Sequence, residues 1–193
     1  MARVAMIVDQ MFEDVEFRIP YDRLLEAGHE VDIIGTQAGK EIKGKQGKET
    51  ICTEKAVGDV SPEDYDALVI PGGYSPDKLR TSTGMVDLTR EMFVADKPVA
   101  AVCHAGWMLA EADVADERTM TSWPSITTDL LNAGARWVDR EVVEDGNLIT
   151  SRKPDDLDAF SSAILRQLEH GPAPRIEPPR APGTTSEEPP SIH

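Results

Sequence analysis

The 193-residue sequence is short of several features that mark particular classes of protein. It contains only two cysteines, Cys52 and Cys103, which is too few for the disulfide framework of a small secreted domain. No apolar run approaches the roughly 18 residues that a membrane-spanning helix needs, and no signal-peptide cleavage site follows the short apolar run at the N-terminus. We therefore expect a cytoplasmic protein, in which a free thiol stays reduced.

Positive charge is also scarce. The 20 Lys and Arg residues are outnumbered by 35 Asp and Glu residues, so the formal net charge is −15 at pH 7. An acidic surface repels phosphate backbones and anionic lipid headgroups. The composition therefore argues against nucleic acids and membranes as partners, while the 40% share of hydrophobic residues is ordinary for a folded domain.

Short apolar runs alternate along the chain with helical patterns. Strands are predicted at residues 4–8, 31–34, 67–70 and 99–102, and helices at 13–27, 85–94, 105–112, 125–133 and 154–168. Strands that alternate with helices are typical of a parallel sheet covered on both faces. We therefore predict an α/β fold with three layers and a doubly wound, mostly parallel sheet.

Other segments depart from this alternation. Glycines and lysines within residues 37–60 predict a small hairpin or edge insertion, and a second hairpin is predicted around 145–146, between strands at 137–143 and 148–150. Pro20 predicts that the helix at 13–27 is kinked or starts late.

The end of the chain has a different composition. Residues 171–193 contain seven prolines and no helical or strand period. Such a segment is typical of a disordered or extended tail. We predict a single domain of residues 1–170 and a Pro-rich tail of residues 171–193, which either extends freely or lies against its own domain or a neighbouring one.

Residues that can carry chemistry follow three of the predicted strands. These residues are Glu13 and Glu16 after the first strand, Gly72, Gly73 and Asp77 after the strand at 67–70, and Cys103 and His104 after the strand at 99–102. The carboxyl ends of parallel strands meet at one edge of an open α/β sheet, where ligands bind. We therefore expect these residues to share one site.

Cys103 ends a buried strand and opens a helix, which is the pattern of a nucleophile elbow. A helix N-terminus carries partial positive charge that stabilises a thiolate, whereas a free thiol with a pKa of about 8.5 is only slightly ionised at neutral pH. His104 could add charge or act as a base, although adjacent side chains often point in different directions. The alternative is that Cys103 is an inert, small apolar residue of the core.

Glu13 and Glu16 are spaced to share a helix face. An ionised carboxylate near Cys103 raises the pKa of the thiol, whereas a protonated carboxyl donates a hydrogen bond to the thiolate. We assign the general acid/base role to Glu16. Gly72 and Gly73 allow a close backbone approach, and their N–H groups could form an oxyanion hole. The alternatives are a solvated helix start for the two glutamates and a plain turn for the glycines. No spacing of His, Cys and Asp suggests a metal site.

The sequence resembles the PfpI family, which is named for an intracellular peptidase and is related in fold to class I glutamine amidotransferases. The resemblance covers about residues 1–170 and rests on blocks at 12–16, 20–24, 27–31, 66–73, 97–104 and 121–124. It implies a flavodoxin-like or class I glutamine amidotransferase-like fold. The superfamily includes the Parkinsonism-associated protein deglycase, and the resemblance implies an enzyme without a cofactor.

The resemblance also implies roles for individual residues. Cys103 matches the nucleophile of the family, and His104 matches the histidine beside it. Glu16 matches a buried glutamate that hydrogen-bonds the cysteine, and Glu13 matches a second acidic position near the pocket. Asp77 matches an acidic residue that orients the histidine across a subunit interface in the peptidase-like members, which implies a homodimer or hexamer.

The oxyanion pocket of the family corresponds to Gly73 and the N–H of His104. The family commonly has Gly-Pro after Cys-His, but here Trp107 lies in the first turn of the helix and could narrow the pocket. Trp123 stands where relatives often carry tyrosine, so a substrate-binding hydroxyl is absent. Both tryptophans are also candidates for ordinary core packing.

The sequence leaves three functions open. The first is a cysteine-dependent general stress protein that acts on small reactive carbonyls or glycated proteins, as a glyoxalase or protein deglycase does. The second is an intracellular cysteine peptidase with a Cys103–His104–Asp77 triad shared between subunits. The third is a non-catalytic redox sensor, in which Cys103 is oxidised, or a chaperone.

Overall fold

A seven-stranded sheet forms the centre of this computed structural model, which describes residues 1–178. The strand order is β10-β11-β7-β6-β1-β2-β5. The strands are β1 (Arg3–Ile7), β2 (Glu30–Gly35), β5 (Lys55–Ala56), β6 (Ala67–Ile70), β7 (Val99–Val102), β10 (Val142–Asp145) and β11 (Leu148–Ser151). Neighbouring strands in this sheet are parallel, except that β10 and β11 are antiparallel. The predicted α/β fold with a mostly parallel, doubly wound sheet is therefore confirmed.

The strands β6 and β7 are buried along their whole length. A strand that is covered on both faces reads as a continuous apolar run, as these two do. Val69 of β6 pairs with Met6 of β1 on one side and with Ala100 of β7 on the other. The ends of these strands are therefore nearly level, and the segments that follow them leave the sheet at one edge.

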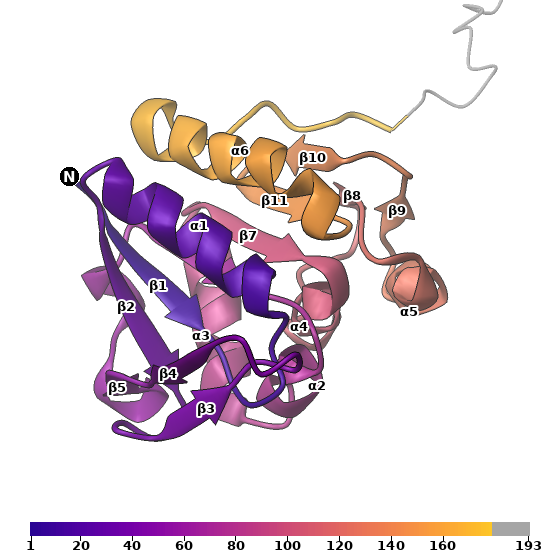
Figure 1. Cartoon of the computed structure of the whole chain (residues 1–193). Helices are drawn as coiled ribbons and strands as arrows, with labels where there is room; N and C mark the ends of the chain where they lie inside the picture. Colours follow the sequence, from indigo (N-terminus) through magenta and orange to yellow (C-terminus); the bar gives the residue numbers. More distant parts are fainter. Residues whose placement is uncertain (179–193) are drawn as a thin grey trace, which may run out of the picture.

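Helices cover both faces of the sheet. Figure 1 shows α1 (Asp14–Glu26) and α6 (Leu157–His170) side by side on one face, and α3 (Thr83–Val94) and α4 (Gly106–Glu111) on the other. Alternate residues of β1 divide between the two faces, because successive side chains of a strand point in opposite directions. Met6 packs in the same core as Phe17 of α1 and Phe160 of α6, whereas Ile7 packs in the same core as Met92 of α3.

The remaining helices and strands of residues 1–178 are short. The predicted hairpin within 37–60 is confirmed as an antiparallel pair, in which Ile42 lies opposite Ile51. The elements not yet named are β3 (Glu41–Lys43), β4 (Thr50–Cys52), β8 (Thr119–Met120), β9 (Arg136–Trp137), α2 (Ser75–Leu79), α5 (Thr127–Asn132) and the 3₁₀ helices η1 (Val57–Asp59), η2 (Pro62–Asp64), η3 (Cys103–Ala105), η4 (Pro124–Ile126) and η5 (Pro154–Asp156). No helix among residues 1–178 is long and apolar enough to cross a membrane.

Two local predictions are corrected by the structure. The helix α1 begins at Asp14 and continues through Pro20, so the late start predicted from this proline is wrong. Proline removes one backbone donor and its ring crowds the carbonyl four residues earlier, but the burial of Phe17 and Leu24 on either side keeps the helix on the sheet. The hairpin around 145–146 is present, but Trp137 belongs to β9, which pairs with β8 rather than with β11.

The part of the predicted tail that the structure describes lies against the domain. Arg175 forms a 3.0 Å ion pair with Asp145, whose side chain is fully buried. The backbone N–H of Ile176 donates to the same carboxylate at 2.7 Å, and Ala173 donates to the carbonyl of Gly146 at 3.1 Å. Residues 171–178 are therefore extended and held in place, whereas residues 179–193 of the predicted tail lie outside the described residues.

Candidate active site

The turn after β7 gives Cys103 an unusual backbone. Cys103 has φ of 62°, in the left-handed region that non-glycine residues rarely adopt. Strain of this kind clusters at functional sites, where the surrounding structure must hold it in place. The predicted sharp turn is therefore present, and it leaves the residue Cys103 only 7% exposed at the edge of the sheet.

Glu16 lies buried in the first turn of α1, facing Cys103. One carboxyl oxygen accepts a 2.9 Å hydrogen bond from the N–H of Gly72, and the other has no protein partner among residues 1–178. Burial, together with the nearby charge of Glu13, raises the pKa of Glu16 to about 8. Glu16 is therefore mostly protonated at neutral pH and can donate its proton toward the sulfur of Cys103.

The protonation of Glu16 controls the thiol. Burial raises the pKa of Cys103, and the charge of an ionised Glu16 raises it further, while the N–H groups of Gly73 and His104 lower it. When Glu16 holds its proton, the repulsion disappears and the carboxyl O–H becomes a donor to the thiolate. The two groups therefore accommodate one negative charge much better than two.

The two glycines after β6 are required by the geometry of this pair. A side-chain carbon on Gly72 would lie 2.7 Å from the Cβ of Cys103 and would also collide with the carboxyl of Glu16. Gly73 has φ of 77°, and a Cβ there would lie 2.5 Å from the backbone nitrogen of Glu13. Other site residues therefore lie close to the backbone at both glycines, as the sequence predicted.

His104 contacts the thiol directly, which the sequence had left open. Its Nδ1 is 3.2 Å from the sulfur of Cys103, and its Nε2 is 3.2 Å from the hydroxyl of Ser125 on η4. Burial, and then the charge of Lys45, lower the pKa of His104. A neutral imidazole beside a thiol can accept its proton.

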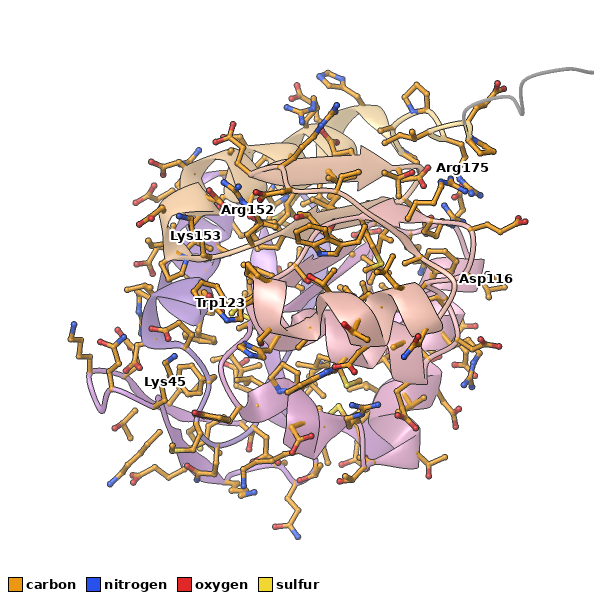
Figure 2. All side chains as sticks on the ribbon, turned by 90° about the vertical axis from the view of Figure 1, so that its right-hand side faces the viewer. Lys45, Asp116, Trp123, Arg152, Lys153 and Arg175 are labelled. Atoms are coloured by element: carbon orange, nitrogen blue, oxygen red, sulfur yellow. The ribbon has the colours of Figure 1, made fainter. Side chains whose placement is uncertain are left out.

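Both candidate tryptophans lie beside His104. The ring of Trp107 is 5.1 Å from the imidazole, and its indole N–H donates to Asp129 at 2.8 Å. The ring of Trp123 is 6.4 Å from the imidazole and 38% of this residue is exposed. Figure 2 shows Trp123 and Lys45 on the same face of the molecule. Trp107 therefore packs beside the site, while Trp123 forms part of its open wall.

Asp77 forms no hydrogen bond with the other predicted site residues within residues 1–178. It is exposed on α2, where it lines a surface cleft together with Arg80, Arg90 and Glu111. Within residues 1–178 of one chain it forms no hydrogen bond to His104, whose outer nitrogen contacts Ser125 instead. A Cys103–His104–Asp77 triad is therefore not assembled inside a single chain, and the contact across subunits stays a prediction.

The sequence analysis missed one basic and one polar residue of the site. They come from the turn between β3 and β4: Lys45 forms a 2.6 Å ion pair with Glu13, and Gln46 donates to the other oxygen of Glu13 at 2.8 Å. Lys45 also lies close enough for its charge to interact with those of Cys103 and Glu16. Nothing in the sequence distinguishes Lys45 from the other lysines of this segment.

Comparisons with known proteins show which family this chain belongs to. The sequence matches the DJ-1/PfpI family over residues 2–167. Protein/nucleic acid deglycase 2 of Escherichia coli K12 is 45% identical over 167 residues, which cover 86% of this chain and 97% of that protein. General stress protein 18 of Bacillus subtilis is 42% identical over 168 residues, which cover 86% of this chain and 98% of that protein.

A solved structure shows the same relationship. Drosophila melanogaster DJ-1beta matches with a TM-score of 0.80 and 32% sequence identity, over 86% of this chain and 89% of that chain. The resemblance to the PfpI family that the sequence blocks carried is thus confirmed. The chain belongs to the DJ-1/PfpI family.

Proposed function

We propose that this protein is a cysteine-dependent stress protein that hydrolyses reactive carbonyls, as a glyoxalase or protein deglycase does, with Cys103 as nucleophile and Glu16 as general acid/base. The observation that carries the proposal is the buried Glu16 carboxyl, with a pKa of about 8, which faces the thiol of Cys103. The names of two relatives, a deglycase and a general stress protein, support it. The reaction needs a reduced thiol, which fits the cytoplasmic location expected from the sequence.

Methylglyoxal illustrates the chemistry. The thiol of Cys103 passes its proton to His104, its sulfur adds to the aldehyde carbon, and the carbonyl oxygen takes a proton from Glu16 to give a hemithioacetal. The N–H groups of Gly73 and His104, which face the sulfur, can stabilise the charge that develops on this oxygen.

Glu16 then completes the reaction as a base and an acid. Its carboxylate takes the hydrogen of the former aldehyde carbon as a proton and returns it to the neighbouring carbon, while the hydroxyl proton moves to the oxygen of that neighbouring carbon. The hemithioacetal thereby becomes a thioester. Water hydrolyses the thioester and restores the thiol. One methylglyoxal and one water give one lactate, so no cofactor is consumed.

Methylglyoxal consumption without added thiol tests the proposal. We expect turnover by the wild type, none by Cys103→Ala, and a loss of at least about 100-fold in Glu16→Gln, as for removal of a general acid/base. Cys52→Ala is the matched control, because this second cysteine is exposed and lies on β4. Turnover that survives in Cys103→Ala would contradict the proposal.

The 3.2 Å contact between Cys103 and His104 also suits a cysteine peptidase, which is the second candidate. This activity needs an acidic residue that orients His104, and Asp77 could supply it only from another copy of the chain. The candidate therefore requires a homodimer or hexamer. Light scattering gives the oligomeric state, and small-peptide hydrolysis should be lost in Asp77→Ala; a monomer would rule out the shared triad.

A further inference from the structure

Three acidic residues at the start of α1 are buried, and only two of them face the site. Glu13 is 4% exposed, Asp14 is 1% exposed and Glu16 is fully buried. Glu16 faces Cys103, and Glu13 binds Lys45 and Gln46. Asp14 takes no part in the proposed chemistry, yet burying a carboxylate is costly unless it is well compensated.

Asp14 is compensated by backbone N–H groups of the turn between β3 and β4. It accepts hydrogen bonds from the N–H groups of Gln46 at 2.9 Å, Lys48 at 2.8 Å and Glu49 at 2.8 Å. Burial alone would raise the pKa of Asp14, but these N–H groups outweigh it and lower the pKa. The carboxylate therefore clamps residues 46–49 to the start of α1.

The clamped turn presents its inner side to the site. Lys45 and Gln46 bind the two oxygens of Glu13, and the backbone N–H of Lys45 donates to the carbonyl of Phe12 at 2.8 Å. The far end of the turn is held by the ion pair between Arg18 and Glu49. A shift of this turn would therefore displace the ammonium group of Lys45, which is bound to Glu13 and whose charge interacts with those of Cys103 and Glu16.

We propose that Asp14 is a positioning residue for the reactive thiol: it fixes the turn 44–49 so that the ammonium of Lys45 stays beside Cys103 and Glu13. The inference rests on the proposed role of Cys103 as the reacting group. The charged and titratable side chains that interact with Cys103 within the described residues are Glu16 on α1, His104 on η3 and Lys45 from the turn. Glu13 acts on this group through its contacts with Lys45 and its charge near Glu16. Asp14 acts on the thiol through Lys45.

The alternative is that Asp14 only stabilises the hairpin of β3 and β4. Both roles lower thermal stability when Asp14 is changed, so stability does not separate them. The pH dependence of Cys103 alkylation by iodoacetamide does, because the rate follows the thiolate fraction. Mass spectrometry of the cysteine-containing peptides measures the alkylation of Cys103 separately from that of Cys52. This measurement does not depend on turnover of any substrate.

The test compares Asp14→Asn, Lys45→Gln and the double variant with the wild type. Loss of the ammonium removes a charge that stabilises the thiolate. The alkylation profile should therefore move to higher pH in both single variants, with a fall of about threefold or more at pH 7, which equals a shift of about half a pH unit. The double variant should show no larger shift than Lys45→Gln alone, because Asp14 acts through Lys45.

Asp145→Asn is the matched control. Asp145 is as buried as Asp14 and also accepts backbone N–H groups, from Thr119 and Ile176. It precedes β11 at the opposite end of the sheet from Cys103, since Leu148 pairs with Val99 and Ser151 pairs with Val102. Figure 2 shows Arg175, the partner of Asp145, far across the molecule from Lys45. This variant should be less stable, with an unchanged alkylation profile.

The outcomes separate this inference from the proposed function. An unchanged profile in Asp14→Asn, or a shift in the double variant that equals the sum of the single shifts, would overturn the positioning role. If Asp14→Asn does not fold, an unchanged profile in Lys45→Gln overturns it instead. Absence of methylglyoxal turnover in the wild type would contradict the proposed function and leave the alkylation result standing.

Discussion

The carboxyl of Glu16 and the thiol of Cys103 face each other in a single buried space that exists because residue 72 is glycine. A Cβ at Gly72 would meet both groups. Glu16 comes from α1 and Cys103 from the turn after β7, so residues far apart in sequence share this space. The predictions below follow from this arrangement and its surroundings.

Activity should fall as the pH rises through about 8. Glu16 has a pKa of about 8 and must carry a proton to donate to the substrate oxygen. The logarithm of kcat/KM for methylglyoxal, plotted against pH, should therefore decline on the alkaline side near this value. In Glu16→Gln the residual rate should lack this decline, and a decline that persists in the variant would assign it to another group.

The stability of the protein should fall as Glu16 ionises. Folding raises the pKa of Glu16 from its ordinary value of 4.5 to about 8. The contribution of Glu16 to the free energy of unfolding is therefore full below pH 4.5 and is lost as the pH rises toward about 8. Urea unfolding at pH 5 and pH 8 measures this. The free energy of unfolding of Glu16→Gln, relative to that of the wild type, should rise by more than about 1 kcal/mol between pH 5 and pH 8. No growth would mean that Glu16 ionises normally.

Gly72→Ala should damage both the fold and the reaction. Its new methyl group would lie 2.7 Å from the Cβ of Cys103 and 2.9 Å from the carbonyl oxygen of Val102. We expect a loss of about 1–3 kcal/mol in the free energy of unfolding, as for other overpacked cores, with loss of methylglyoxal turnover. Gly58→Ala is the matched control, since a Cβ there meets nothing within 4 Å. Equal stability of the two variants would contradict this account.

Ser125 should orient His104 within one chain. Its hydroxyl is 3.2 Å from Nε2 of the imidazole and is exposed, so Ser125→Ala removes a contact at little cost to stability. We expect Cys103 alkylation at pH 7 to slow by a few-fold, or about 0.5–1 kcal/mol, with an unchanged melting temperature. Unaltered alkylation in Ser125→Ala together with slower alkylation in Asp77→Ala would instead indicate orientation by another copy of the chain.

The ion pair between Arg175 and Asp145 should stabilise the domain without affecting the thiol. Within residues 1–178, Arg175→Ala leaves the buried carboxylate with its two backbone donors, the N–H groups of Thr119 and Ile176. We expect a loss of about 1–3 kcal/mol in the free energy of unfolding, as for a hydrogen bond to a charged group. Urea unfolding checks the loss. A melting temperature equal to that of the wild type would mean that residues 171–178 add nothing to stability.

Local patterns in the sequence were enough to predict the frame of the site. The continuous apolar run at 99–102 indicated a buried strand, and the residue after it had to turn into a helix, which placed Cys103 at the edge of the sheet. Paired glycines at 72 and 73 indicated a close approach. These predictions succeed because the burial of a strand and the conformational freedom of glycine can both be recognised from the residue types of a short stretch of sequence.

The tertiary structure alone decided the protonation of Glu16, the place of Lys45 and the contact of His104 with Ser125 rather than with Asp77 within residues 1–178. The pKa of Glu16 depends on burial and on a charge network that runs through Glu13 to a lysine from a distant turn. Electrostatic effects act through space and depend on burial and on distances of a few ångströms. The sequence therefore determined which groups reach the edge of the sheet, and packing decided which of them carry charge and which touch.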